Sequence, residues 1–365
     1  MENLKENFAS EPKILVIGLG GGGNNALDRM IRSNIRGVDY VAMNTDIQVL
    51  NECTADIKIQ LGRKITKGFG AGSDANIGET AALENEEEIK ELIKNYDLCI
   101  ITCGLGGGTG TGAAPVVSGF CQELDILTVA VVTIPFSFES TPRITAANQG
   151  LGKLEENVDT LLSIPNDKLL NLSDKPLLLE DAFVIADSVL KYTIEGITNI
   201  IYNKGMINLD FNDLKTTLAK KGIGHLGIGI VDTEMSILEA VKQAVNSPLL
   251  DTSIQGASNL LINTCGSVNI SDLNEAVSYV RELAGEHVNI IWGTVSSTDY
   301  DENKIVVTLI ATGMNNTKSN NSDILIIQSS DLTEWIKKPV KIKPTYSPQN
   351  ITIPKFILDS PRRKS

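Results

Sequence analysis

The chain has 365 residues, a formal charge of −13 at pH 7 and a calculated isoelectric point near 4.8. That length allows two domains with substantial cores. The acidic charge argues against nucleic acid as the main partner, because nucleic acid favours a basic surface. No apolar run approaches the ~18 residues of a membrane-spanning helix, and the first twelve residues are polar, so we expect a cytoplasmic protein. Five cysteines without a Cys-x-x-Cys pair indicate free thiols in a reducing compartment.

After a flexible arm at residues 1–12, the chain up to about residue 180 alternates short apolar runs with helical patterns. This alternation predicts a doubly wound parallel sheet, in which the loops at the carboxyl edge of the strands meet and bind ligands. Strands are expected near 13–17, 38–43, 57–61, 97–103, 127–133 and 160–164. Helices are expected near 23–33, 79–94, 112–123 and 143–158.

A first glycine loop follows the first strand. Gly18, Gly20 and Gly23 satisfy the G-x-G-x-x-G dinucleotide fingerprint, and Asp46 follows the second strand, where an acid binds ribose in such proteins. Taken alone, this part of the chain indicates an NAD-dependent Rossmann oxidoreductase.

A second glycine loop, residues 104–112, follows the fourth strand and precedes a helix in whose first turn Pro115 is expected. Glycines let the backbone approach an anion, and the N–H groups of a first helical turn point at it. A dehydrogenase does not need this loop. Two such loops could hold opposite sides of one polyphosphate, and the chain has no P-loop motif.

The second half begins with a long apolar helical pattern over 180–203, typical of a helix buried between two bodies. A smaller second α/β domain follows, with strands near 225–231, 259–265, 288–295 and 304–311 and helices near 234–246 and 271–285. After Gly313 the composition becomes polar. The expected divisions are therefore a nucleotide-binding domain at 13–180, a central helix at 181–205, a second domain at 206–313, a flexible linker at 314–350 and a terminal peptide at 351–365.

These motifs together resemble the tubulin/FtsZ family of GTPases, and within it the FtsZ proteins of the bacterial cell-division ring. The resemblance covers residues 13–313. Its most specific marks are 106–112, which is similar to the family's signature loop, and 208–213, which is similar to its catalytic loop. Supporting marks are 44–46, 68–72, 135–139, Arg143, 164–167, 182–187 and 247–250.

The resemblance implies that GTP is the ligand, with the phosphates on the two glycine loops and the γ-phosphate under Ala71 and Gly72. Phe183 is expected to stack on guanine. Asp187 is expected to accept hydrogen bonds from guanine donors that adenine lacks. Without the resemblance, Phe183 and Asp187 are more typical of a core aromatic residue and a surface acid. The expected nucleotide-binding residues are Gly20, Gly21, Gly22, Asn24, Asn44, Asp46, Ala71, Gly72, Gly104, Gly106, Gly107, Gly108, Thr109, Gly110, Thr111, Gly112, Pro135, Glu139, Arg143, Asn166, Phe183 and Asp187.

The expected catalytic residues are Asp210, Asp213 and Asn208. Two acids beside a helix start are, by themselves, most typical of helix caps. The resemblance implies instead that they polarise the water that attacks the GTP of a neighbouring subunit. Mg²⁺, held on the phosphates and not by protein side chains, is expected to offset their charge. A site completed by the next subunit generates an open filament.

We therefore expect a polymerising GTPase of the bacterial division ring, located at mid-cell. Its expected partners are further copies of itself and membrane-tethering adaptors that bind 351–365. The alternatives are a tubulin-like filament that positions plasmids or phage, and an NAD-dependent oxidoreductase, which leaves 104–112 and 208–213 unexplained. The chain departs from the family pattern at Ile134, Ser140, 74–76 and 221–225.

Overall fold

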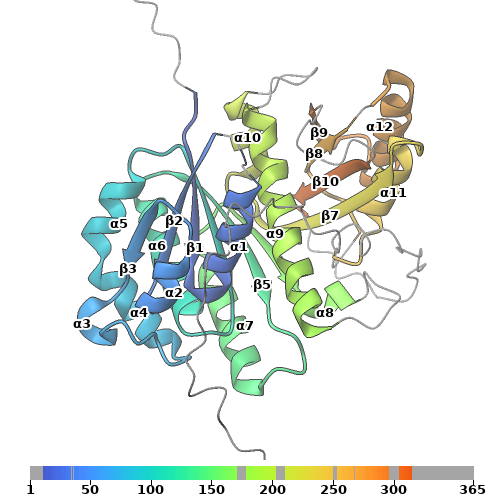
Figure 1. Cartoon of the computed structure of the whole chain (residues 1–365). Helices are drawn as coiled ribbons and strands as arrows, with labels where there is room; N and C mark the ends of the chain where they lie inside the picture. The colour runs from blue at the N-terminus through green and yellow to red at the C-terminus, as the bar shows by residue number, and fades with distance from the viewer. Residues whose placement is uncertain are drawn as a thin grey trace, which may run out of the picture.

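A ten-stranded sheet runs through the molecule in the order β3-β2-β1-β4-β5-β6-β7-β10-β8-β9 (Figure 1). The computed structural model describes residues 11–33, 35, 37–170, 178–202, 210–249, 253–266, 268–295 and 304–314. The arm at 1–10, residue Asn208 and the segments 315–350 and 351–365 lie outside these ranges, so the predictions made for them stay predictions.

The first six strands are mutually parallel and confirm the doubly wound arrangement. They are β1 (Ile14–Leu19), β2 (Val38–Asn44), β3 (Ile57–Gln60), β4 (Leu98–Gly104), β5 (Leu127–Ile134) and β6 (Thr160–Pro165). The direction of winding reverses between β1 and β4, which pair directly, with Leu19 opposite Cys103. Such a reversal opens a crevice at the carboxyl ends of the two strands. Both glycine loops begin there.

Eight helices are described between β1 and the long helix α9. They are α1 (Gly20–Arg32), α2 (Ile47–Glu52), α3 (Arg63–Thr66), α4 (Ala75–Glu84), α5 (Glu86–Ile93), α6 (Thr109–Glu123), α7 (Thr141–Glu155) and α8 (Asn166–Leu169). The short helices α2, α3 and α8 were not predicted, because four to six residues are too few to show a helical period.

Two boundary predictions were wrong. The helix expected over 79–94 is divided at Asn85, whose side-chain oxygen accepts a hydrogen bond from the Gly62 N–H at 2.9 Å. Helix α6 starts at Thr109, because Gly112 N already donates to Gly108 O at 3.1 Å. Pro115 therefore lies in the second turn of α6 and not in the first.

Helix α9 (Leu179–Tyr202) confirms the expected central helix. It contacts α1 and β5 on one side and β8, β9 and β10 on the other. One hydrophobic cluster joins residues of β1 and β4 to residues of β8 and β10 through α9 side chains such as Val189 and Ile197. Figure 1 shows α9 running between the two halves of the molecule. The helix is apolar around most of its circumference because both sides are covered.

The second half of the sheet is attached through β7 (Gly222–Asp232), which pairs in parallel with β6 and antiparallel with β10 (Lys304–Thr312). Strand β10 pairs with β8 (Asn259–Cys265), and β8 pairs with β9 (Asn289–Val295). Helices α11 (Ile237–Val245) and α12 (Ile270–Ala284) contribute to a separate core cluster with these strands. Helix α10 (Phe211–Leu218), whose start was expected beside Asp210 and Asp213, precedes β7.

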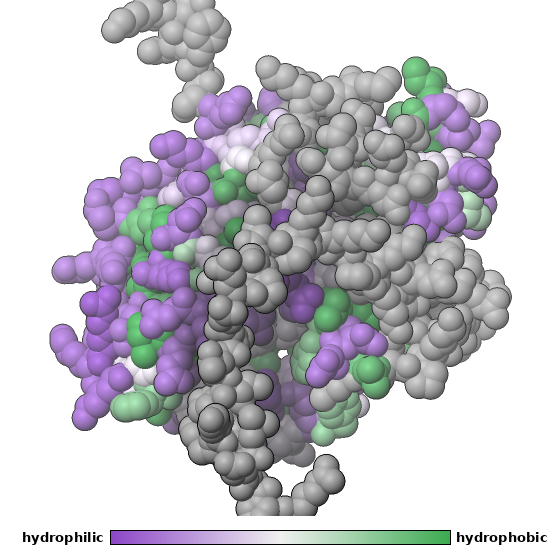
Figure 2. Space-filling view, in the orientation of Figure 1, coloured by the Kyte–Doolittle hydropathy of each residue, from purple (hydrophilic) through white to green (hydrophobic). Residues whose placement is uncertain are grey.

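The face of the molecule seen in Figure 2 carries mostly hydrophilic residues over the described part of the first half, with smaller hydrophobic groups between them. Within the described ranges, no helix combines the length and apolar character that crossing a membrane requires.

The packing of α7 gives a test within one helix. Gly150 is buried, and a Cβ built there would lie 2.5 Å from Thr111 Cγ2, whereas a Cβ at exposed Gly152 meets nothing within 4 Å. We expect Gly150→Ala to lower the free energy of unfolding by roughly 1–3 kcal/mol through overpacking. Gly152→Ala is expected to raise it by roughly 0.5–1 kcal/mol through helix propensity. Urea unfolding of the two variants measures both, and equal effects would contradict this packing.

Candidate functional site

The two glycine loops lie against each other at the β1–β4 crevice. A Cβ at Gly20 would lie 3.0 Å from Gly110 N, and one at Gly22 would lie 3.1 Å from Gly104 N. Side chains here would force the two backbones apart. By contrast, Cβ atoms at Gly21 and Gly107 would point into open space. The loops therefore combine close backbone contact with free room beside them, which suits a ligand that is bound by main-chain groups.

The amino end of α6 faces this crevice without a side-chain cap. Its N-cap residue is Gly108, and the N–H groups of the first turn precede the first bond of the helix, from Gly112 to Gly108. Such donors, together with the helix dipole, attract anions. The hydroxyl of Thr111 accepts from Gly106 N at 2.8 Å, and that of Thr109 bonds the Thr45 hydroxyl at 2.6 Å. Both hydroxyls thus brace the loop from within.

A third loop borders the same space. Ala71 Cβ and Asp74 N lie 2.8 and 2.9 Å from the position of a Gly108 Cβ. Gly72 has a φ of +58°, a conformation that residues with a side chain rarely adopt. A Cβ at this position would meet nothing within 4 Å. Asp74 caps α4 by accepting from Asn76 N at 2.9 Å. A cavity of 330 Å³ lies between this loop, the start of α6 and α7.

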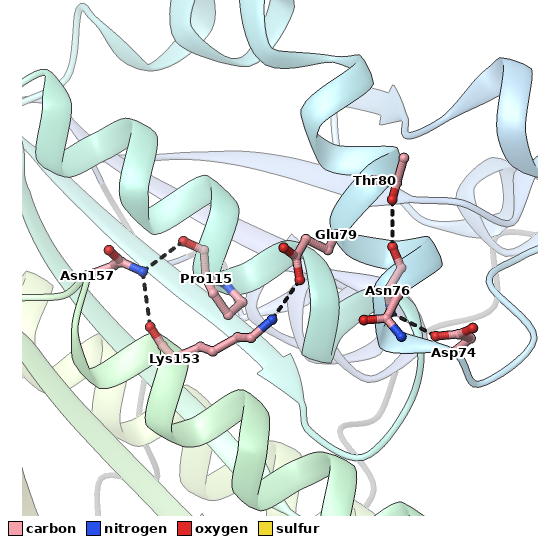
Figure 3. Close-up of polar contacts among 7 residues, drawn as sticks. All are labelled: Asp74, Asn76, Glu79, Thr80, Pro115, Lys153 and Asn157. Carbon is pink, nitrogen blue, oxygen red and sulfur yellow. Dashed lines mark hydrogen bonds and ion pairs between the residues drawn. The ribbon is translucent and has the colours of Figure 1, made fainter.

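An ion pair closes one side of that cavity. Lys153 Nζ of α7 reaches Glu79 Oε2 of α4 at 2.7 Å, and Figure 3 shows the lysine side chain extending across to the glutamate. At the end of α7, the side-chain amide of Asn157 donates to the Pro115 carbonyl at 3.4 Å and to Lys153 O at 3.0 Å. These contacts hold α4, α6 and α7 together around the loop that carries Gly72.

Asn24, Asn44 and Asp46 form a bracing network behind the first glycine loop. Asn24 Nδ2 donates to Gly18 O at 2.9 Å, and Asn44 Nδ2 donates to Asn24 Oδ1 at 2.7 Å. Asn44 Oδ1 accepts from Asp46 N at 3.1 Å, and Asp46 Oδ1 accepts from Gln48 N at 2.9 Å as the cap of α2. The amides are buried, so their main effect is to fix the loop conformation.

Glu139, Arg143 and Pro135 lie on the other side of Gly106. Glu139 Oε2 pairs with Arg143 Nε at 3.0 Å, and Glu139 Oε1 accepts from Phe136 N at 2.9 Å. A Cβ at Gly106 would lie 2.8 Å from Arg143 Cγ and 3.2 Å from Pro135 Cγ. The φ of +93° at Gly106 also requires glycine.

The first turns of α9 complete this group with aromatic and acidic side chains. Phe183 is 44% exposed, and its ring meets that of buried Phe136 edge to face at 5.6 Å. Nearby, α8 begins with Asn166, a buried side chain whose Oδ1 has no hydrogen-bond partner among the described residues. A buried acceptor without a donor is costly, and a ligand bound beside it could supply that donor.

Asp187 lies one helical turn beyond Phe183. Its Oδ2 pairs with Arg29 Nε of α1 at 2.8 Å, and its side chain is 14% exposed. Burial raises the pKa of Asp187 to about 6, although the Arg29 guanidinium pulls it down. A buried carboxylate with a perturbed pKa, next to an exposed aromatic ring, is a candidate for a functional site.

Asp210 and Asp213 lie elsewhere. They form a capping box at the start of α10, in which Asp210 Oδ1 accepts from Asp213 N at 2.9 Å and Asp213 Oδ2 accepts from Asp210 N at 3.4 Å. The helix-cap interpretation of this pair is thus confirmed. Leu218, at the end of α10, accepts from the Thr160 hydroxyl at the first residue of β6, which is the edge of the sheet opposite the glycine loops.

Sequence reasoning missed Arg29 and gave Phe136 only as part of a motif. Arg29 stands in the last turn of an amphipathic helix, where a basic residue is ordinary. Its contact with Asp187 joins α1 to α9, and no local pattern announces it.

A reversal point with two contacting glycine loops and an uncapped helix start defines an α/β protein that binds a phosphorylated ligand. Residues 13–174 match the GTPase domain of the Tubulin/FtsZ family, and residues 222–315 match the C-terminal domain of the FtsZ family. The chain belongs to the FtsZ family, and this membership supports GTP binding and GTPase activity in general.

Solved structures agree. An empty FtsZ dimer from M. jannaschii is 42% identical, has a TM-score of 0.80, and the match covers 83% of this chain and 89% of that one. CetZ1 from Haloferax volcanii, in a GDP-bound monomer, is 19% identical with a TM-score of 0.71, and the match covers 89% of this chain and 98% of that one. A GTPγS-bound protofilament of CetZ2 from Haloferax volcanii is 18% identical with a TM-score of 0.71, with 88% and 96% covered. The two CetZ structures show the shared fold.

We expect the buried carboxylate of Asp187 to lower the free energy of unfolding of the protein. The pKa of Asp187 in the folded protein, about 6, exceeds the value of 3.8 for the free side chain, so its charge destabilises the fold above pH 6, and this penalty disappears as pH falls towards 4. We expect Asp187→Asn to stabilise the nucleotide-free protein at pH 7 by on the order of 1–3 kcal/mol, and by less at pH 5. Denaturant unfolding at both pH values measures this. Glu180→Gln, an exposed change on the same helix, is the control, and a destabilised Asp187→Asn variant would refute the assignment.

Proposed function

We propose that this protein is a GTPase that polymerises head to tail into a cell-division filament and hydrolyses GTP where two subunits meet. The observation that carries the proposal is the separation between the two glycine loops and the acidic pair of Asp210 and Asp213. Phe183 and Tyr202 are 19 residues apart on α9, which corresponds to about 28 Å along the helix. Asp210 follows beyond the far end, so it would act on the nucleotide of another subunit.

In this proposal the glycine loops hold the phosphates through main-chain N–H groups. The loop with Ala71 and Gly72 covers the γ-phosphate, and the adjoining cavity beside α7 leaves room for an approaching partner. Phe183 stacks on guanine, and Asp187 accepts from its N1–H and amino groups. Glu139, Arg143 and Asn166 contact the ribose and the base. The orphan Oδ1 of Asn166 supports such a contact, because the ligand would supply its missing donor.

Mg²⁺ is expected on the phosphates. The space between the loops is lined by glycine backbone, and the nearest loop acids, Asp46 and Asp74, already cap α2 and α4. This lining fits a cation that keeps phosphate and water ligands, as Mg²⁺ prefers. When bound, it would offset the phosphate charge.

The capping box supports a catalytic role for the acidic pair in a neighbouring subunit. Each carboxylate accepts a hydrogen bond from a backbone N–H through one of its oxygens, and this bond fixes the orientation of the carboxylate. The other oxygen of each exposed side chain is then available to polarise a water molecule, with Asn208 assisting. Positioning of this kind is most of what phosphoryl transfer requires.

Self-association is supported by the relatives, since the M. jannaschii structure is an FtsZ dimer and the CetZ2 structure is a protofilament. A role in the bacterial division ring at mid-cell, the domain boundaries at 180 and 206, and the nucleotide contacts above are part of this proposal. A filament that positions plasmids or phage is the second candidate. The family match leaves the oxidoreductase alternative without support.

Mixing two inactive variants tests the shared site. Asp210→Asn should keep the α10 cap, because asparagine is a good N-cap residue, but it should bind GTP without hydrolysing it. Gly107→Asp should bind GTP at least tenfold more weakly through charge repulsion, while its Cβ meets open space and the fold survives. An equimolar mixture should recover a measurable fraction of wild-type phosphate release. No recovery from two folded variants, shown by circular dichroism, would count against the shared site.

The terminal segment 351–365 is proposed to bind a membrane-tethering adaptor, through the apolar residues Ile353, Phe356 and Ile357. We expect truncation after Gln349 to leave the GTPase rate within about twofold of the full chain, because the segment is tethered. Sedimentation with adaptor-coated vesicles should be lost. If the truncated chain sediments as the full chain does, the terminal segment is not the adaptor site.

A further inference from the structure

The ion pair between Arg29 and Asp187 joins the helix that begins at the first glycine loop to the helix proposed to read the base. Arg29 Nε contacts the carboxylate oxygen Oδ2 at 2.8 Å. An ionised carboxylate has about four lone-pair positions on its two oxygens. Arg29 can therefore stay in place while Asp187 accepts two further hydrogen bonds.

The protonation state of Asp187 decides which base it can bind. As a carboxylate it only accepts, and it matches the N1–H and amino donors of guanine. As a neutral acid it has an O–H donor on one oxygen, which meets a guanine donor head-on. The same neutral acid matches adenine, which offers an N1 acceptor beside an amino donor. Protonation would thus weaken guanine binding and improve adenine binding together.

The surroundings of Asp187 favour the neutral form, and Arg29 opposes it. Burial raises the pKa to about 6, and the Arg29 charge and hydrogen bond both lower it. Two acids of the packed helices accept hydrogen bonds from other groups. Asp28 of α1 accepts from Thr54 N at 2.6 Å, and Asp167 of α8 accepts from Ser137 N at 2.9 Å. Among the described residues, Arg29 is the charged group that shifts the Asp187 pKa.

We propose that Arg29 sets the base specificity of the site by holding Asp187 as an oriented carboxylate whose remaining lone pairs accept from guanine. Arg29 is a positioning residue, because it acts on the base through Asp187. This inference rests on the proposed function, in which Asp187 faces the base.

The test measures binding of GDP and ADP, which avoids hydrolysis, to the full chain between pH 5.5 and 8.5. The variants are Arg29→Gln, which removes the charge, and Arg29→Lys, which keeps it. For the wild type, GDP affinity should fall as pH drops through 6. For Arg29→Gln the fall in GDP affinity should begin at higher pH. At pH 6.5 the preference for GDP over ADP should therefore be at least about threefold smaller than in the wild type, and at pH 8.5 this preference should recover. Arg29→Lys should follow the wild type.

The outcomes separate the two claims. If Arg29→Gln weakens GDP binding by the same factor at every pH, or leaves the profile unchanged, the role assigned to Arg29 is wrong while the proposed function stands. If the wild type shows no preference for GDP over ADP at pH 8.5, the proposed function itself fails.

Discussion

Helix α9 imposes the constraint on which the rest of the account depends. It is buried on both sides, contacts the strands of both halves, and keeps the glycine loops and the acidic pair at opposite edges of one sheet. In the proposed function, one copy of the chain would hold two incomplete parts of a site, because a packed helix of this length does not bend to bring its ends together. Under this proposal assembly and hydrolysis would be coupled by geometry, since the contact that extends a filament would also complete the chemistry.

Three residues of the proposed base site have energetically unfavourable surroundings. Burial of Asp187 favours its neutral form, and the buried Oδ1 of Asn166 has no hydrogen-bond partner within the described part of the chain. Phe183, one helical turn from Asp187, leaves its ring partly in solvent although it contacts Phe136. A ligand with donors and an aromatic face would relieve all three. Binding sites commonly carry such costs, which the remainder of the fold must offset.

Much of the fold could be predicted because buried strands in such a sheet are continuous apolar runs. All ten strands were placed within a few residues, and α9 was recognised by its apolar circumference. Short helices were missed where they lack a period, and the start of α6 was placed too late because glycines carry no hydrophobic signal. The glycine loops were visible in the sequence, but their mutual contact, the Glu79–Lys153 pair and the link from Arg29 to Asp187 depend on tertiary packing. The helix cap that Asp210 and Asp213 form does not exclude a catalytic pair at these positions, since the same two residues can serve as both.

The concentration dependence of phosphate release tests the central claim most directly. With GTP and Mg²⁺ in excess, the rate per molecule should be near zero in dilute protein and rise to a plateau as subunits meet. A rate per molecule that stays constant down to the lowest concentration at which the protein remains folded would show that one subunit contains a complete site, and it would contradict the account.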